Sequence, residues 1–80
     1  MKEQLDLLDK NLQQAFKMSE NLVALNIKYL YSIGLKNPVE LISITPQLFL
    51  LSNELVQEKT QGIDVNLINE DPYEILEYIG

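Results

Sequence analysis

The fold of this chain depends on one stretch near its middle, Leu22-Val23-Ala24-Leu25-Asn26-Ile27-Lys28-Tyr29-Leu30-Tyr31-Ser32-Ile33-Gly34-Leu35. Its apolar residues fall on nearly all sides of a helix, and such a helix is normally the buried centre of a bundle. Gly34 stands where a helix commonly ends in the left-handed conformation. The stretch therefore predicts a central helix that ends near Gly34.

The segment before this stretch has apolar residues at helical spacings of three and four: Leu5, Leu8, Leu12 and Ala15. Residues 5–33 then have two interpretations. They form either one continuous helix with a coiled-coil seam, in which Asn26 occupies an a position, or two ordinary bundle helices with Ser19 capping the second. The small Ala15 and the polar Ser19 weaken the middle of the seam, which favours two helices.

Two helix-start signals follow Leu35. Asn37-Pro38-Val39-Glu40 places a capping residue before a first-turn proline, with a glutamate three residues after the cap. Thr45-Pro46 repeats the cap and proline before a leucine-rich run. We therefore expect a short helix over residues 38–44 and a longer one over residues 46–59.

Residues 63–68 alternate apolar and polar side chains, which is the period of a strand. The rest of the sequence has no other strand-like segment. This one is therefore expected to be extended, either packed across the helices as an arm or paired with another chain. Asp71-Pro72-Tyr73-Glu74 is a third combination of cap, proline and glutamate, and it predicts a last short helix.

Together these signals predict an all-α fold and a single helical domain over residues 1–80. The domain is expected to be a small bundle of four to five helices with a short extended segment near residues 63–70. Its core is expected to centre on Leu22, Ile27, Leu30, Ile33, Leu41, Leu48, Leu51 and Leu55.

Histidine, cysteine and arginine are absent from all 80 residues. The chain thereby lacks the commonest general base and metal ligand, the thiolate nucleophile, and the side chain best suited to bidentate binding of phosphate. The acidic residues from 64 to 74 do not follow the ligand spacing of a calcium loop, and Asp71 with Glu74 is better explained as a helix cap and its partner. We therefore expect no enzyme, no cofactor and no metal site, and we assign no catalytic residue.

Charge is divided unevenly along the chain, whose net charge is −6. Residues 1–36 carry five lysines and four carboxylates, which gives +1, whereas residues 37–80 carry one lysine and eight carboxylates, which gives −7. An acidic half repels nucleic acid and anionic lipid and attracts a basic protein surface. Because no apolar run is long enough for a membrane span and no secretory signal is seen, we expect a cytoplasmic protein without direct nucleic-acid or membrane binding.

Residues 29–35 end in a turn of glycine and leucine, and residues 45–55 contain a proline followed by leucines. The expected short helix lies between the two segments. This pattern resembles one repeat of the mitochondrial transcription termination factor family, which stacks many such repeats and offers a basic groove. The part from Gly34-Leu35 to Leu41 is also similar to a helix-hairpin-helix motif, although the second, phosphate-gripping glycine hairpin is absent. Both resemblances concern how three helices turn, and no functional residue is carried over from either.

The sequence as a whole favours a non-catalytic protein–protein interaction module, regulatory or involved in assembly, with a second copy of the chain as one candidate partner. The alternatives are a helical nucleic-acid-associated module and an acidic decoy that blocks a nucleic-acid-binding protein. The expected partner-binding residues are two leucines and the C-terminal acids: Leu7, Leu50, Glu70, Asp71, Glu74 and Glu77.

Overall fold

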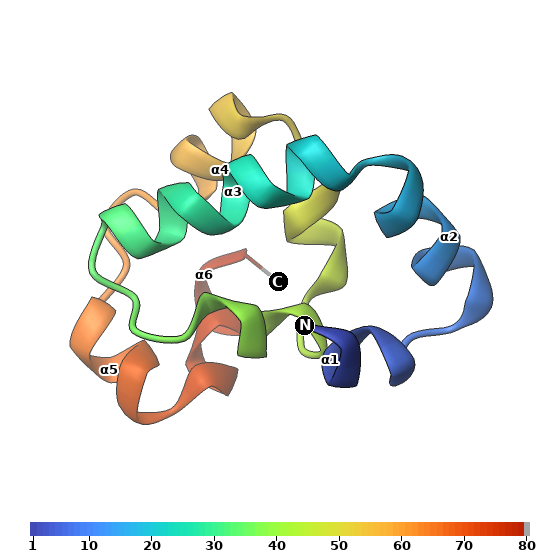
Figure 1. The fold of residues 1–80 in the computed structure, drawn as a ribbon. Coiled ribbons are helices and arrows are strands. Elements are labelled where there is room, and N and C mark those ends of the chain that lie inside the picture. Colours follow the sequence, from blue (N-terminus) through green and yellow to red (C-terminus); the bar gives the residue numbers. More distant parts are fainter. Residues whose placement is uncertain (80) are drawn as a thin grey trace.

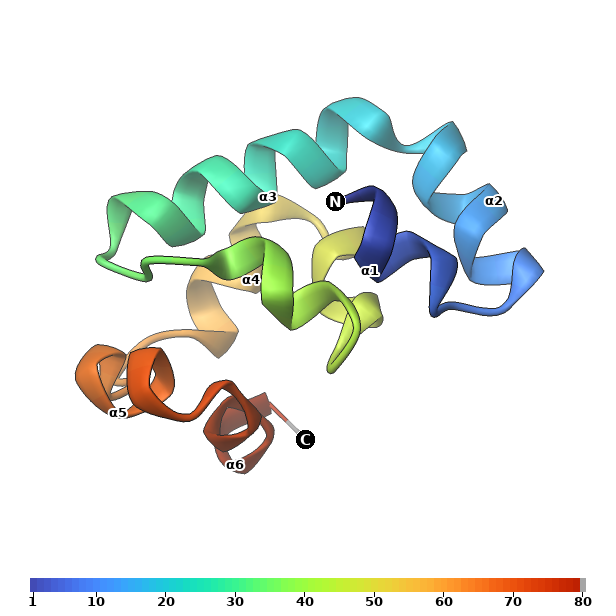
Figure 2. The same ribbon diagram turned by 60° about the horizontal axis from the view of Figure 1, so that its bottom comes forward.

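Helix α3 (Glu20–Ser32) is the longest element of the structure, a computed structural model that describes residues 1–79. Figure 2 shows it along one edge of the molecule, with most of the other elements below it. Its buried residues are Val23, Asn26, Ile27 and Leu30. Leu25 and Tyr31 on its outer face are 50% and 51% exposed. The predicted helix is confirmed, but its predicted position at the centre of a bundle is wrong, because one of its faces meets solvent.

The end of α3 follows the prediction for Gly34, which has φ +108°. The Leu35 N–H donates to the carbonyl of Leu30 at 3.2 Å, and the Gly34 N–H donates to the carbonyl of Tyr31 at 3.1 Å. These two bonds form a Schellman motif, which satisfies carbonyls at the end of the helix. The Asn69 side chain then accepts from the Lys36 N–H at 2.9 Å and so fixes the loop that follows.

Helices α1 (Lys2–Asp6) and α2 (Lys10–Met18) precede α3, and the chain bends sharply between α2 and α3 (Figures 1 and 2). The bend is at Ser19, which has φ −121° and ψ 31°, outside the helical region. It allows Phe16 to pack against Phe49, with ring centroids 6.5 Å apart. The chain therefore bends at Ser19, as the two-helix alternative expected, and the continuous coiled-coil helix is wrong. The first of the two predicted helices is itself divided into α1 and α2 by residues 7–9, and Ser19 makes no side-chain capping hydrogen bond to α3.

The segment after Leu35 forms two 3-10 helices, η1 (Pro38–Ile42) and η2 (Pro46–Leu50), followed by α4 (Asn53–Lys59). The short helix predicted over residues 38–44 is confirmed as the shorter η1, but the predicted continuous helix over residues 46–59 is wrong. The predicted caps Asn37 and Thr45 make no side-chain capping hydrogen bond. Leu51 is extended, with φ −78° and ψ 157°, and divides it. Ser52 then caps α4 by accepting from the Leu55 N–H at 3.3 Å.

The division at Leu51 is held by Asn26, whose side chain is fully buried on α3. Its Nδ2 donates to the carbonyls of Phe49 at 3.0 Å and Leu51 at 2.9 Å. Its Oδ1 accepts from Asn53 Nδ2 at 3.0 Å. The carbonyls at the junction of η2 and α4 thus accept hydrogen bonds from a side chain of α3, because the break at Leu51 leaves them without N–H donors of a continuing helix.

The C-terminal part contains α5 (Val65–Glu70), η3 (Pro72–Ile75) and α6 (Leu76–Ile79). The predicted extended segment near residues 63–70 is wrong, because residues 65–70 are helical and the described residues contain no strand. Asp64 begins α5 by accepting from the Leu67 N–H at 3.1 Å. The last short helix is confirmed as η3 and α6, and the Asp71 side chain accepts from the Tyr73 N–H at 3.2 Å.

The all-α fold is confirmed for residues 1–79, with more and shorter helices than expected. Four of the predicted core residues are buried: Ile27, Leu30, Leu41 and Leu48. Three are half-buried: Leu22, Ile33 and Leu51. Leu55 is 42% exposed, and its assignment to the core is wrong because the break at Leu51 rotates α4. The core also includes Phe16, Val23, Leu35, Ile42, Phe49, Val56, Ile68 and Ile75.

Candidate functional site

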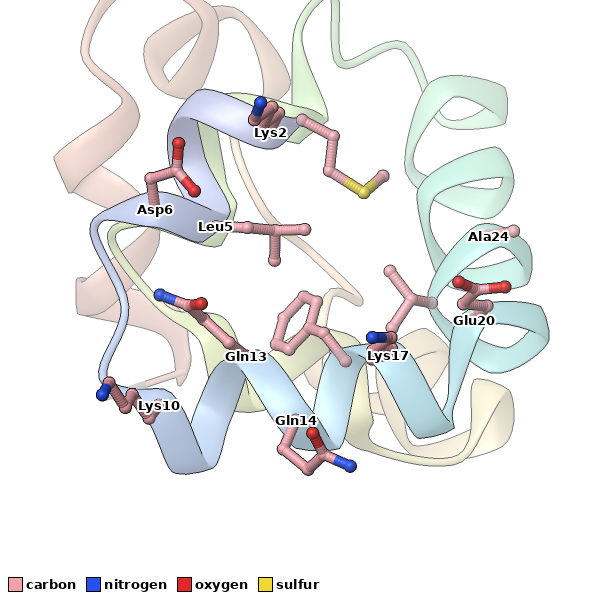
Figure 3. A pocket seen from close by; sticks show the side chains of 12 residues that line it. Lys2, Leu5, Asp6, Lys10, Gln13, Gln14, Lys17, Glu20 and Ala24 are labelled. Carbon is pink, nitrogen blue, oxygen red and sulfur yellow. The ribbon is translucent and has the colours of Figure 1, made fainter.

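A cavity of about 790 Å³ lies between α1, α2 and the beginning of α3. Figure 3 shows Lys2, Leu5 and Asp6 of α1 on one side and Lys10, Gln13, Gln14 and Lys17 of α2 on the opposite side. The cavity exists because Ser19 turns the chain, so that three helices meet around it. We call it the N-terminal groove.

The floor of the N-terminal groove is apolar. Phe16 and Val23 line it and are each 3% exposed, because their side chains also belong to the core. Leu5 is half-buried, packs against that core and points into the groove from α1 (Figure 3). An apolar floor of this kind can hold the apolar side chains of a bound segment.

The edges of the N-terminal groove are charged. Three of the six lysines of the chain line it, together with the two carboxylates Asp6 and Glu20. These five side chains carry a net charge of +1, whereas the remaining three lysines and ten carboxylates of the chain carry a net charge of −7. The groove is therefore a locally basic place on an acidic molecule and favours an acidic occupant.

The second candidate surface is formed by the end of α5 with η3 and α6. We call it the C-terminal face and define it as Glu70, Asp71, Tyr73, Glu74, Leu76, Glu77 and Tyr78. Tyr73 is 67% exposed, Leu76 43% and Tyr78 40%. Within these nine consecutive residues, three acidic and three large apolar side chains are exposed to solvent.

The predicted partner-binding residues fall into three places. Glu70, Asp71, Glu74 and Glu77 all lie on the C-terminal face, where Glu74 is half-buried and the other three are exposed. Leu7 lies at the end of α1 and is 75% exposed. Leu50, at the end of η2, is half-buried and packs against the core. The four acids lie within eight consecutive residues, and the two leucines are not among the residues of that face.

The lysines of the N-terminal groove were missed by the sequence analysis. Lys10 and Lys17 are seven residues apart, so they lie two turns apart on one side of α2. That spacing was a usable signal. The contribution of α1 had no comparable signal, because the way α1 packs against η1 is a tertiary feature.

The two surfaces differ in what they can do chemically. The groove offers apolar contacts and lysine ammonium groups, and the C-terminal face offers carboxylates beside exposed aromatic rings. In residues 1–79, no three metal-ligating side chains are gathered in one place. Within the same residues, no helix has the length and apolar character to cross a bilayer.

No protein family, curated protein or solved structure matches the chain. The two likenesses seen in the sequence therefore stay resemblances of local helix turns.

Proposed function

We propose that this chain is a small, non-catalytic protein–protein interaction module, regulatory or involved in assembly, that acts in the cytoplasm. It binds a protein with a basic surface through the C-terminal face. The observation that carries the proposal is the gathering of four carboxylates and three exposed large side chains on residues 70–78.

The composition of the C-terminal face supports binding to protein. Carboxylates steer a basic partner toward the surface and fix its orientation. Exposed tyrosine and leucine side chains supply apolar area that is released from water on contact. A surface that only keeps a protein soluble needs the charges but not the exposed rings.

Capture of partners from a cell extract tests this proposal. The full chain is immobilised, and bound proteins are identified for the wild type, for the double variant Glu70→Lys/Glu77→Lys, and for the control Glu54→Lys/Glu58→Lys. Both variants change the net charge equally, and all four positions are exposed. We expect a protein that is retained by the wild type and the control but lost from the variant of the C-terminal face.

Salt separates this function from the alternatives. The expected partner should dissociate as salt approaches about 1 M, where the Debye length is about 3 Å. A partner that is itself a nucleic-acid-binding protein, displaced from its nucleic acid by this chain, would identify the acidic decoy. Direct binding of labelled DNA or RNA at low salt would instead support a nucleic-acid-associated module. Equal capture by the wild type and Glu70→Lys/Glu77→Lys would refute the role of the C-terminal face.

A further inference from the structure

The N-terminal groove and the C-terminal face are complementary to each other. The groove has an apolar floor, and its three lysines and two carboxylates carry a net charge of +1 on an acidic molecule. The C-terminal face has four carboxylates beside three exposed large side chains. The basic protein surface that the face requires is therefore present on the chain itself.

Within one molecule the two surfaces do not meet. Both α1 and η3 pack against η1. Figure 2 shows α5 and α6 at one end of the molecule, apart from α1 and α2. Helix α2 and helix α5 lie at opposite ends of the molecule in both views (Figures 1 and 2). The complementarity can be used only between two molecules.

We propose that the N-terminal groove binds the C-terminal face of a second copy of this chain, and that the contact is reciprocal. Two copies placed side by side and antiparallel make the contact twice around a two-fold axis, which closes the assembly as a dimer. In each contact Tyr73 and Leu76 cover the apolar floor at Leu5, while Glu70 and Glu77 face the lysines of α2. This inference rests on the proposed function, since it names the partner of the C-terminal face.

Two opposite charge reversals give a sharp test. In Lys10→Glu/Lys17→Glu the groove becomes acidic, and in Glu70→Lys/Glu77→Lys the face becomes basic. Each variant alone would place like charges together in both contacts of its dimer. In an equimolar mixture of the two variants, every groove meets a face of opposite charge, so both contacts are restored.

The molar mass of the purified chain is measured by sedimentation equilibrium over a range of concentrations. We expect the wild type to rise from 9.2 kDa to twice that mass and to stop there. Each variant should weaken the dimer by about tenfold or more, because like charges are juxtaposed at its contacts. The equimolar mixture should regain the dimer, and higher salt should weaken it again.

Matched controls carry the same charge changes at exposed sites outside both surfaces. They are Lys28→Glu/Lys59→Glu for the groove and Glu54→Lys/Glu58→Lys for the face. Both should dimerise like the wild type, and far-ultraviolet circular dichroism checks that every variant is folded. Chemical-shift changes of the wild type on dilution, which need no variant, should be confined to the two surfaces.

Several results would overturn the inference. They are a wild type that stays at 9.2 kDa at millimolar concentration, a dimer indifferent to both reversals, a mixture that fails to associate, and a mass that rises beyond the dimer. A monomer from which Glu70→Lys/Glu77→Lys still removes a captured protein would refute this inference and leave the proposed function intact. A monomer that also captures nothing would refute both.

Discussion

Asn26 offers the sharpest test of how this fold is held together. Its side chain is fully buried on α3 and makes three hydrogen bonds to the junction of η2 and α4, two donated to the carbonyls of Phe49 and Leu51 and one accepted from Asn53. Asn26→Ala removes all three at once. The carbonyl of Phe49, whose hydrogen bond to Asn26 is buried, is then left without this donor.

The expected loss in the free energy of unfolding is about 3 kcal/mol. Three hydrogen bonds at a net 0.5 to 1.5 kcal/mol each give about 1.5 to 4.5 kcal/mol, and an unsatisfied buried carbonyl adds to the lower part of that range. A domain of 80 residues has a total stability of about 4 to 12 kcal/mol. The substitution should therefore remove a large fraction of the stability.

Urea unfolding followed by far-ultraviolet circular dichroism measures this loss as a lower midpoint at a similar m-value. Asn21→Ala is the matched control, because it makes the same side-chain truncation at an exposed position of the same helix. It should stay within about 0.5 kcal/mol of the wild type. Asn53→Ala, which deletes only one of the bonds to Asn26, should cost about 1 kcal/mol. If Asn26→Ala were as stable as Asn21→Ala, the polar junction would not hold the two segments together.

Three further predictions use the same unfolding measurement. Gly34→Ala should lower the free energy of unfolding by about 1 kcal/mol more than Gly62→Ala does. Both glycines have positive φ, but a Cβ added at Gly34 would lie 3.2 Å from a methyl group of Val65 in α5, whereas a Cβ added at Gly62 would have no atom within 4 Å. Equal losses would show that the approach of α5 is not tight. Asp64→Ala removes the side-chain cap of α5 and should lower stability by about 1 kcal/mol, and no loss would mean that α5 needs no cap. Leu7→Glu should change the free energy of unfolding by no more than about 0.5 kcal/mol, because Leu7 is 75% exposed. Leu50→Glu should lower the free energy of unfolding by about 2 kcal/mol or more, because Leu50 packs against the core. Equal effects of the two substitutions would contradict this placement of the two leucines.

The parts of the fold that sequence predicted are those decided by neighbouring residues. Gly34 ends α3 because the left-handed turn needs a residue without a Cβ, and that requirement is visible in the sequence. Asp71 before Pro72 begins the last helical segment through a bond to the Tyr73 N–H two residues away. Ser19 separates two helices, as the weak seam around it indicated.

The parts that sequence missed are decided by distant residues or by too few residues. The break at Leu51 receives its hydrogen bonds from Asn26, which is 25 positions away in the chain. In the six residues of α5, Val65 and Leu67 follow an alternating pattern, whereas Val65 and Ile68 have the three-residue spacing of a helix, so the period is ambiguous. The cap at Asp64 distinguishes the helix from the strand.

The candidate site divides in the same way. The acids of the C-terminal face are contiguous in sequence, so their clustering could be predicted without the fold. The N-terminal groove draws its lining from three helices and depends on the angle at Ser19, which no local pattern specifies.

The bend at Ser19 also changes which kind of dimer the chain can form. A continuous helix would pair through a leucine seam, with Asn26 between two chains, and charges at Glu70 and Glu77 would have no part in it. In the bent structure Asn26 is buried within its own chain against the junction of η2 and α4, so it is not available to specify pairing. A dimer sensitive to Glu70→Lys/Glu77→Lys therefore supports the contact between the N-terminal groove and the C-terminal face. A dimer sensitive only to substitutions along the predicted leucine seam would require α2 and α3 to straighten, and the core contact of Phe16 with Phe49 would then be lost.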